Sequence, residues 1–264
     1  MSIKVLVTGA NGQMGKTFEE LFANNKDNIA FTFVAKAELD ITNKQAVADF
    51  FGEKQFDYCV NCAAYTNVEQ AEKTPEPAYL VNGEAVKYLA VACRENNVVL
   101  IHISTDYVFD GKKNQPYTIH DKTNPINEYG KSKLLGEQYI AQTIDAFFII
   151  RTSWLYSKKY GKNFYKTIVE KAKTEESLSI ITSQKGCPTD TVSLSKFVYN
   201  LIEEKSRAYG LYHFSDEEEM TWYDFAKKIL IENGLLGEIK LAKADNYVTF
   251  AKRPKYSILA KNSE

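Results

Sequence analysis

The side chains best suited to proton transfer in this sequence are Tyr129 and Lys133, which lie four residues apart. Positions four apart share one face of a helix, and Leu134, Leu135 and Glu137 continue a helical pattern. A free phenol has a pKa of about 10, and a neighbouring ammonium group lowers that value by stabilising the phenolate. The pair could therefore protonate a carbonyl oxygen while hydride reaches the carbonyl carbon.

Spacing alone does not single out this pair, because Tyr223 and Lys227 repeat it. With 17 Tyr and 33 Lys and Arg in 264 residues, about two such pairs are expected by chance. Location favours the first pair, which follows the apolar run 98–103 and its long loop. Thr105 stands just past that run, where its hydroxyl could bind the same carbonyl oxygen or, alternatively, its own backbone.

Three glycines, Gly9, Gly12 and Gly15, follow the apolar run 3–7 and open a helical pattern. In dinucleotide-binding folds the first glycine permits the turn, the second lets the backbone approach a pyrophosphate, and the third lets the helix pack on the strand. The N–H groups of the helix N-terminus would face the phosphates. The alternative is a glycine-rich turn without a ligand.

Lys36 stands where an NAD-selective fold carries a carboxylate, about 20 residues past the glycines. A lysine attracts the 2′-phosphate that a carboxylate would repel, so NADPH is the expected cofactor, with NADH possible. Two alternatives remain open: Glu38 is near enough to accept a hydrogen bond from the ribose, and Lys36 could be a solvated loop residue.

The elements that must position these groups follow from hydrophobic periodicity. Runs apolar on both faces, typical of a covered parallel sheet, span residues 3–7, 31–34, 56–61, 98–103 and 147–151. Capping patterns predict helix starts at Thr42, with Gln45 three residues on, and at Thr74, which precedes Pro75. The expected fold class is α/β: a doubly wound parallel sheet (Rossmann) with a smaller C-terminal α+β region.

The alternation of strand-like and helical patterns becomes less regular past Trp154. We expect residues 1–155 to form the dinucleotide-binding domain, with 178–205 returning to it, and 156–177 and 206–264 to form a substrate-binding region. Thr221 with Asp224 is predicted to cap a helix that runs to about Asn233.

Composition and charge restrict the classes of partner that we expect for this protein. A formal charge of −1 lacks the basic excess expected of nucleic-acid binders. No apolar run approaches the roughly 18–20 residues of a membrane helix, so we expect a cytoplasmic protein with no membrane partner, as a monomer or homodimer.

Cys59 and Cys62 form a C-x-x-C in a strand-like run, where positions three apart point to opposite faces. No second pair follows, so we interpret both cysteines as packing residues.

Motifs along almost the whole chain are similar to those of the short-chain dehydrogenase/reductase family, in its extended, nucleotide-sugar branch. Within that branch the chain most resembles the dTDP-4-dehydrorhamnose reductases. The matching motifs are residues 9–15, 39–42, 61–66, 104–109, 129–133, 151–156 and 186–189, and Arg253-Pro254 with Ser257 and Leu259.

The resemblance implies reduction of the 4-keto group of dTDP-4-dehydro-L-rhamnose by NADPH or NADH. It implies that Tyr129 is the proton donor, Lys133 its partner and a ribose ligand, and Thr105 a hydroxyl beside the carbonyl oxygen. The expected cofactor contacts, besides Tyr129 and Lys133, are Gly9, Gly12, Gln13, Met14, Gly15, Lys36, Asp40, Ile41, Ala63, Ala64, Tyr65 and Thr66. The expected contacts of the dTDP-sugar are Thr105, Asp106, Trp154 and Arg253. Alternatively, Trp154 only plugs the seam between the two regions and Arg253 is a surface residue.

Some features depart from the family pattern. Cys62 replaces the usual alanine, an exchange of one small residue for another. Residues 190–193 read Asp-Thr-Val-Ser and do not match the acidic pattern with which some members hold a metal, so we expect no metal site.

Two other functions remain as alternatives. A sugar-nucleotide dehydratase or epimerase is disfavoured, because Tyr107 stands where dehydratases carry a catalytic carboxylate. A non-catalytic NADP-binding regulatory subunit, resembling the β-subunit of methionine adenosyltransferase, would not need Thr105, Tyr129 and Lys133.

Overall fold

Six parallel strands form the central sheet of the computed structural model, which describes residues 2–24, 28–216, 218–245 and 249–260. Their order is β10-β5-β4-β3-β1-β2, and every neighbouring pair is parallel. The strands are β1 (Ile3–Thr8), β2 (Ile29–Val34), β3 (Tyr58–Asn61), β4 (Val99–Thr105), β5 (Phe147–Thr152) and β10 (Gly210–His213). The doubly wound parallel sheet predicted from the doubly apolar runs is confirmed.

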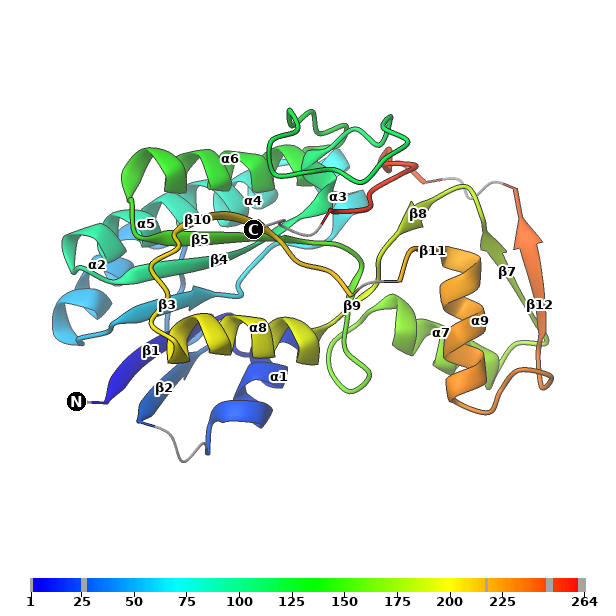
Figure 1. Cartoon of the computed structure of the whole chain (residues 1–264), viewed down its shortest axis with the longest axis horizontal. Helices are drawn as coiled ribbons and strands as arrows, with labels where there is room; N and C mark the ends of the chain where they lie inside the picture. The colour runs from blue at the N-terminus through cyan, green and yellow to red at the C-terminus, as the bar shows by residue number, and fades with distance from the viewer. Residues whose placement is uncertain (1, 25–27, 217, 246–248, 261–264) are drawn as a thin grey trace.

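Helices cover both faces of this sheet (Figure 1). One face packs on α1 (Gln13–Phe22) and α8 (Thr191–Glu203), the other on α2 (Lys44–Glu53), α5 (Ala85–Glu95) and α6 (Glu128–Thr143). Shorter segments beside α6 are α3 (Val68–Lys73), α4 (Glu76–Tyr79), the π-helical η1 (Leu80–Glu84) and the 3₁₀ turn η2 (Asp106–Val108). Within the described part of the chain, no helix is both long and apolar enough to span a bilayer.

A second, smaller lobe lies beyond the carboxyl ends of the strands (Figure 1). It consists of α7 (Phe164–Ala172), α9 (Trp222–Glu232) and the parallel pair β7 (Ser177–Ile181) and β12 (Lys240–Ala244). Its core is rich in aromatic and branched side chains, among them Tyr156, Tyr165, Ile168, Phe225 and Ile229. Two short ladders lie between the lobe and the sheet: β6 (Leu155–Tyr156) with β9 (Thr189–Asp190), and β8 (Lys185–Gly186) with β11 (Met220–Thr221).

Strand pairing divides the chain differently from the expected boundaries at two places. The segment expected to return to the first domain at 178 instead pairs, as β7, with β12 of the smaller lobe. The segment 210–213, expected in the substrate region, joins the central sheet as β10 and covers the open edge of β5. Sequence periodicity identifies a strand but not its partner, which explains both differences.

Two predicted helix starts are wrong. The cap of α2 is Asn43, whose side chain accepts the Ala46 N–H, because the Thr42 hydroxyl donates instead to Asp40. Thr74 ends α3, and α4 begins only after Pro75. The predicted capping box at the start of α9 is present.

Candidate active site

A cavity of about 960 Å³ lies where the carboxyl ends of the strands meet the smaller lobe. Residues that follow or end β1, β3, β4 and β5 line one wall, including Gly12, Cys62, Thr105 and Thr152. Side chains from the lobe line the other, including Phe164, Ile168, Leu178 and Trp222. Ligands of open α/β sheets bind at the carboxyl ends of the strands, so this cavity is the candidate active site.

The glycine turn forms one end of the cavity. Gly9 has φ +69°, and a Cβ there would lie 2.5 Å from the backbone N of Ala63, so only glycine fits this turn. A Cβ on Gly15 would lie 2.5 Å from the carbonyl oxygen of Gly9, so this glycine lets α1 pack closely. Gly12 caps α1 without a side-chain hydrogen bond and lines the cavity. The helix N-terminus therefore suits a phosphate group.

Gln13 links this turn to the smaller lobe. Its amide nitrogen donates to the carbonyl of Leu155 at 3.1 Å, and its amide oxygen accepts from Asn163, the cap of α7, at 3.0 Å. Gln13 and Met14 both line the cavity. Through Gln13, the residues expected at the pyrophosphate are joined directly to the opposite wall.

The residues expected around the adenosine lie at the end of β2. Lys36 Nζ is 3.5 Å from Asp40 Oδ2, with side chains 81% and 36% exposed. Glu38 is exposed, and one of its carboxylate oxygens accepts the Ala35 N–H at 2.9 Å. Ile41 is buried. Of the expected cofactor contacts, those outside the cavity lining are Gly9, Gly15, Lys36, Asp40, Ile41, Ala63 and Tyr65.

The loop after β3 contributes Ala64 and Thr66 to the cavity lining. Asn82, on η1, holds this loop by accepting the Tyr65 N–H at 2.9 Å and donating to the Tyr65 carbonyl at 3.0 Å. Asn82 is almost completely buried, and nothing in the sequence pattern distinguished it from a surface asparagine.

Tyr129 meets Thr105 on the cavity wall, as their expected roles require. Thr105 Oγ1 donates to Asp106 Oδ1 at 3.0 Å. The Tyr129 and Thr105 hydroxyls also hydrogen-bond each other. Burial raises the pKa of Tyr129 above its usual range, although the hydrogen bond with Thr105 acts the other way. The phenol is therefore protonated at neutral pH.

Lys133 is almost completely buried and lines the cavity one helical turn after Tyr129. Its amine donates to the carbonyl of Ile103 at 2.6 Å and lies 3.1 Å from His102 Nε2. Burial lowers the pKa of Lys133 to about 8, opposed by Glu137 and Cys62. The prediction that Lys133 lowers the pKa of Tyr129 is wrong, because burial raises that pKa and the Lys133 amine is hydrogen-bonded to the Ile103 carbonyl on β4.

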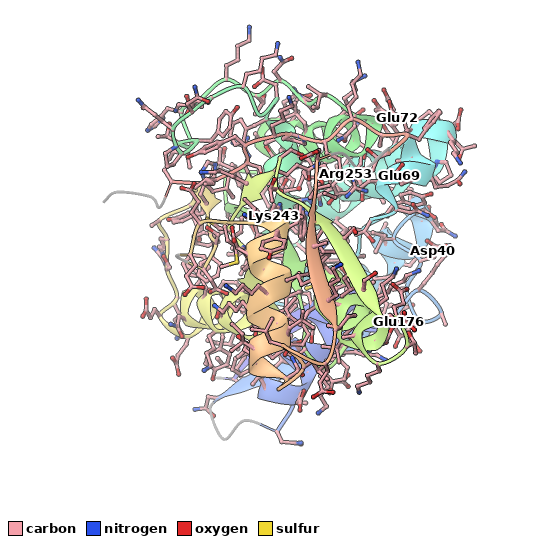
Figure 2. All side chains as sticks on the ribbon, turned by 90° about the vertical axis from the view of Figure 1, so that its right-hand side faces the viewer. Asp40, Glu69, Glu72, Glu176, Lys243 and Arg253 are labelled. Atoms are coloured by element: carbon pink, nitrogen blue, oxygen red, sulfur yellow. The ribbon has the colours of Figure 1, made fainter. Side chains whose placement is uncertain are left out.

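Asp106 and Arg253 line the same part of the cavity. Asp106 is 2% exposed, and burial raises the pKa of its carboxyl to about 7. Arg253 Nη2 pairs with Glu69 Oε1 at 2.8 Å, and Figure 2 shows the two residues close together. Arg253 also hydrogen-bonds Tyr107. The guanidinium is therefore fixed at the cavity wall rather than being a free surface group.

Trp154 both lines the cavity and closes the seam between the lobes. Its ring stacks on Trp222 at 3.5 Å, with an angle of 5° between the planes. Its φ of +47° is unusual for a residue with a side chain. A Cβ on Gly186 would lie 2.5 Å from the Trp154 ring, so this glycine makes room for the indole. Trp222 was not anticipated, and its helical spacing indicates only a core residue.

A buried ion pair that was not predicted from the sequence lies behind the cavity. Arg151 Nη2 on β5 lies 2.6 Å from Glu137 Oε2 on α6, with side chains 4% and 6% exposed. Ser104 donates to the same carboxylate at 2.5 Å. A charged residue inside an apolar strand run was the available signal, as it was for His102.

The cysteines are free thiols, with Cys59 and Cys93 buried and Cys62 at the cavity. Burial raises the pKa of Cys62 to about 12, so this thiol is protonated at neutral pH. In the described residues, no three His, Cys, Asp or Glu side chains gather in a way that could hold a metal ion.

Comparison with known sequences gives a match over nearly the full length. The family described as "RmlD substrate binding domain" matches residues 3–263. The spore coat polysaccharide biosynthesis protein SpsK of Bacillus subtilis is 40% identical, covering 97% of this chain and 89% of that protein. A dTDP-4-dehydrorhamnose reductase of Aggregatibacter actinomycetemcomitans is 38% identical, covering 97% of this chain and 90% of that protein.

A solved structure agrees with the sequence matches. The dTDP-4-dehydrorhamnose reductase of Bacillus anthracis, crystallised with NADP, has a TM-score of 0.94 and 38% identity. The alignment covers 99% of this chain and 92% of that one. The similarity therefore includes both lobes.

Proposed function

The chain belongs to the RmlD family of dTDP-4-dehydrorhamnose reductases, and we propose that it reduces the 4-keto group of dTDP-4-dehydro-L-rhamnose to give dTDP-L-rhamnose, with NADPH as cofactor. One observation carries the assignment to catalysis rather than binding alone. Thr105, Tyr129 and Lys133 lie together in a cavity large enough for a substrate and a cofactor, about 960 Å³. This pathway step supplies a precursor for polysaccharides.

The glycine turn fits a dinucleotide. Its helix N-terminus has no side-chain cap and opens on the cavity through Gly12, Gln13 and Met14. Lys36, exposed at the end of β2, would meet a 2′-phosphate. Asp40 and Ile41 would lie along the adenine, and Ala63, Ala64, Tyr65 and Thr66 along the ribose and nicotinamide. Bound there, the reduced nicotinamide supplies the hydride.

Tyr129 gives the proton. Its phenol is protonated at neutral pH because burial raises its pKa, which is the state a donor needs when a ketone is reduced. The carbonyl oxygen, on which negative charge develops, accepts this proton, and Thr105 would turn its hydroxyl proton from Asp106 to donate to the same oxygen. Thr105 already contacts both Tyr129 and Asp106, so one hydroxyl can align the donor and the substrate.

The sugar nucleotide would lie between the two walls. Asp106 would accept a hydrogen bond from a hydroxyl of the sugar. The Trp154 indole, stacked flat against Trp222, would cover one face of the sugar ring. Arg253, fixed by Glu69, would present its planar guanidinium to the diphosphate.

The test is direct reaction of the purified protein with dTDP-4-dehydrorhamnose, with NADPH and with NADH in turn. We expect loss of the absorbance of the reduced nicotinamide, faster with NADPH, and formation of dTDP-L-rhamnose identified by NMR. Consumption of neither nicotinamide, with the sugar recovered unchanged, would refute the proposal.

A further inference from the structure

A continuous line of buried polar side chains runs from the end of β1 to the amine of Lys133. It passes from Thr8 to Asn61, the last residue of β3, and then to His102 on β4. Thr8, Asn61, His102 and Lys133 are each at most 2% exposed. Buried polar atoms must satisfy one another, so the direction of each hydrogen bond along this line can be deduced.

The orientation of the Asn61 amide is fixed by the backbone. The N–H of Ala63 points at Asn61 Oδ1 at 3.1 Å, and a backbone N–H can only donate. The atom it meets is therefore the amide oxygen, which also accepts the Thr8 hydroxyl at 2.7 Å. The other amide atom is the NH₂ group, a donor, and it lies 3.1 Å from His102 Nδ1.

This orientation determines the tautomer of His102. Burial and the nearby Lys133 lower the pKa of His102 well below its usual value, so the ring is neutral and carries one proton. Nδ1 must accept from Asn61, so that proton is on Nε2. The Nε2–H then points at Lys133 Nζ, 3.1 Å away. An amine nitrogen can accept this hydrogen bond, whereas an ammonium group has no lone pair with which to do so.

We propose that Asn61 holds His102 as the Nε2–H tautomer, and that the imidazole thereby positions Lys133 and favours its neutral amine. The carbonyl of Ile103, 2.6 Å from Nζ, accepts one amine proton and completes the geometry. His102 and Asn61 are thus positioning residues that act on Lys133 and do not touch the reacting atoms.

The other groups facing Lys133 do not compensate for this effect. Glu137, one turn further along α6, favours the ammonium form, but its carboxylate is paired with Arg151 and accepts from Ser104. Cys62, after β3, would favour the ammonium only as a thiolate, and burial raises the pKa of that thiol to about 12. Burial lowers the pKa of Lys133 to about 8, which acts in the same direction as the proposed hydrogen bond from His102.

The consequence is an amine that can gain and lose a proton near neutral pH. An amine of this kind can take up and release a proton during a catalytic cycle, whereas a lysine with a pKa near 10 would act only as a fixed charge. This consequence rests on the proposed function of Lys133. The tautomer itself does not, because it can be measured on the protein alone.

The first experiment reads the tautomer by ¹⁵N NMR of the imidazole side chains, without added cofactor. The chain has 3 histidines, so a single His102→Gln spectrum assigns the signals. We expect His102 Nε2 to resonate as a protonated nitrogen and Nδ1 as an unprotonated one. The reverse pattern overturns the proposal, and the tautomer itself is read on the unsubstituted protein.

The second experiment reverses the direction of the hydrogen bonds between Asn61, His102 and Lys133. Asn61→Asp places an acceptor opposite Nδ1, so the proton moves to Nδ1 and the Nε2 lone pair turns toward Lys133. We expect the titration midpoint of Lys133, followed through its ¹³Cε resonance, to rise by at least about one pH unit. Thr8→Val is the matched control: it removes one donor to Asn61 Oδ1 but leaves the Ala63 N–H, so both tautomer and midpoint should stay.

The pH profile of kcat then connects the network to catalysis. Under the proposed function it should shift upward in Asn61→Asp together with the Lys133 midpoint and stay unchanged in Thr8→Val. A midpoint that does not move in Asn61→Asp refutes the inference. A midpoint that moves while the kcat profile does not supports the network and instead counts against the proposed role of Lys133.

Discussion

The two walls of the cavity are built from different chemistry. The wall formed by the sheet and α6, together with the part of the chain packed behind it, holds every buried ionisable side chain of the His, Lys, Arg, Asp and Glu types in the described residues. These are His102, Asp106, Lys133, Glu137, Arg151 and His213. The wall formed by the smaller lobe is aromatic and apolar inside, and its ion pairs, such as Lys158–Glu232, are at the surface.

This difference indicates that the two walls have different functions, proton transfer at one and substrate recognition at the other. Ionisable groups with fixed partners suit proton transfer, because their positions and protonation states are set before substrate arrives. Aromatic surfaces suit recognition, because they cover sugar and base rings without needing a particular charge.

The largest effect is expected for Tyr129→Phe. Loss of the proton donor should lower kcat by roughly 10²–10⁴-fold while NADPH binding is retained. The matched control is Tyr223→Phe, since Tyr223 has the same spacing to Lys227 but does not line the cavity. Steady-state kinetics and cofactor titration measure both. Full activity of Tyr129→Phe would show that the sheet wall does not supply the proton.

The next effect concerns stability and contrasts an ion pair from each region. Arg151→Met leaves Glu137 buried without its partner and should lower the free energy of unfolding by about 3–5 kcal/mol. Lys158→Met breaks the pair with Glu232, whose side chains are 51% and 31% exposed, and should cost only about 0.2–1 kcal/mol. Urea denaturation measures both. Equal losses would remove the distinction between the walls.

A pH effect follows from His213 on β10. Burial lowers its pKa to about 4 in the folded chain, below the value of about 6.5 in an unfolded one. Between these values the unfolded chain binds a proton that the folded chain does not. The free energy of unfolding should therefore fall as pH drops from about 6.5 to about 4, by up to about 3 kcal/mol from this residue.

His213→Asn tests this contribution, since an amide can still donate to the Tyr117 carbonyl, as Nδ1 does now, but does not titrate. Its loss of stability on acidification should be shallower than that of the parent. His120→Asn, at an exposed position, should keep the parental pH dependence. Identical slopes for all three proteins would contradict the assignment.

The smallest effect is expected on the lobe side. Trp154→Ala should raise KM for the keto-sugar by about 2–10-fold, as expected for the loss of one aromatic contact, and raise it more than KM for NADPH. Trp154→Phe, which keeps a ring against Trp222, should recover most of the loss. A larger effect on kcat than on KM would show that Trp154 acts in the chemical step rather than in substrate binding.

Much of the sheet wall could be predicted from the sequence. Doubly apolar runs identify the parallel strands, and the glycine spacing identifies the turn after β1, because both patterns follow from local geometry. Tyr129 and Thr105 could be named because each stands at the end of a strand or the start of a helix facing the cavity.

The remaining features depend on partners distant in the chain. His102 receives its role from Asn61 and Lys133, and Trp154 from Trp222, 68 residues later. Periodicity carries no information about such pairs. The same limit applies to β7 and β10, which pair across the domain boundaries expected from the sequence. The same limit applies to the start of α2, where Thr42 and Asn43 are equally good caps by residue type. The hydrogen bond from the Thr42 hydroxyl to Asp40 leaves Asn43 as the cap.

The most direct test of the account follows the label from NADPH deuterated at the transferred position on C4 of its nicotinamide ring. With dTDP-4-dehydrorhamnose as substrate, the account predicts deuterium at C4 of the rhamnose product, one atom per cofactor oxidised, read by NMR of the sugar. Oxidation of the cofactor without deuterium at that carbon, or deuterium at any other position of the sugar, would contradict it.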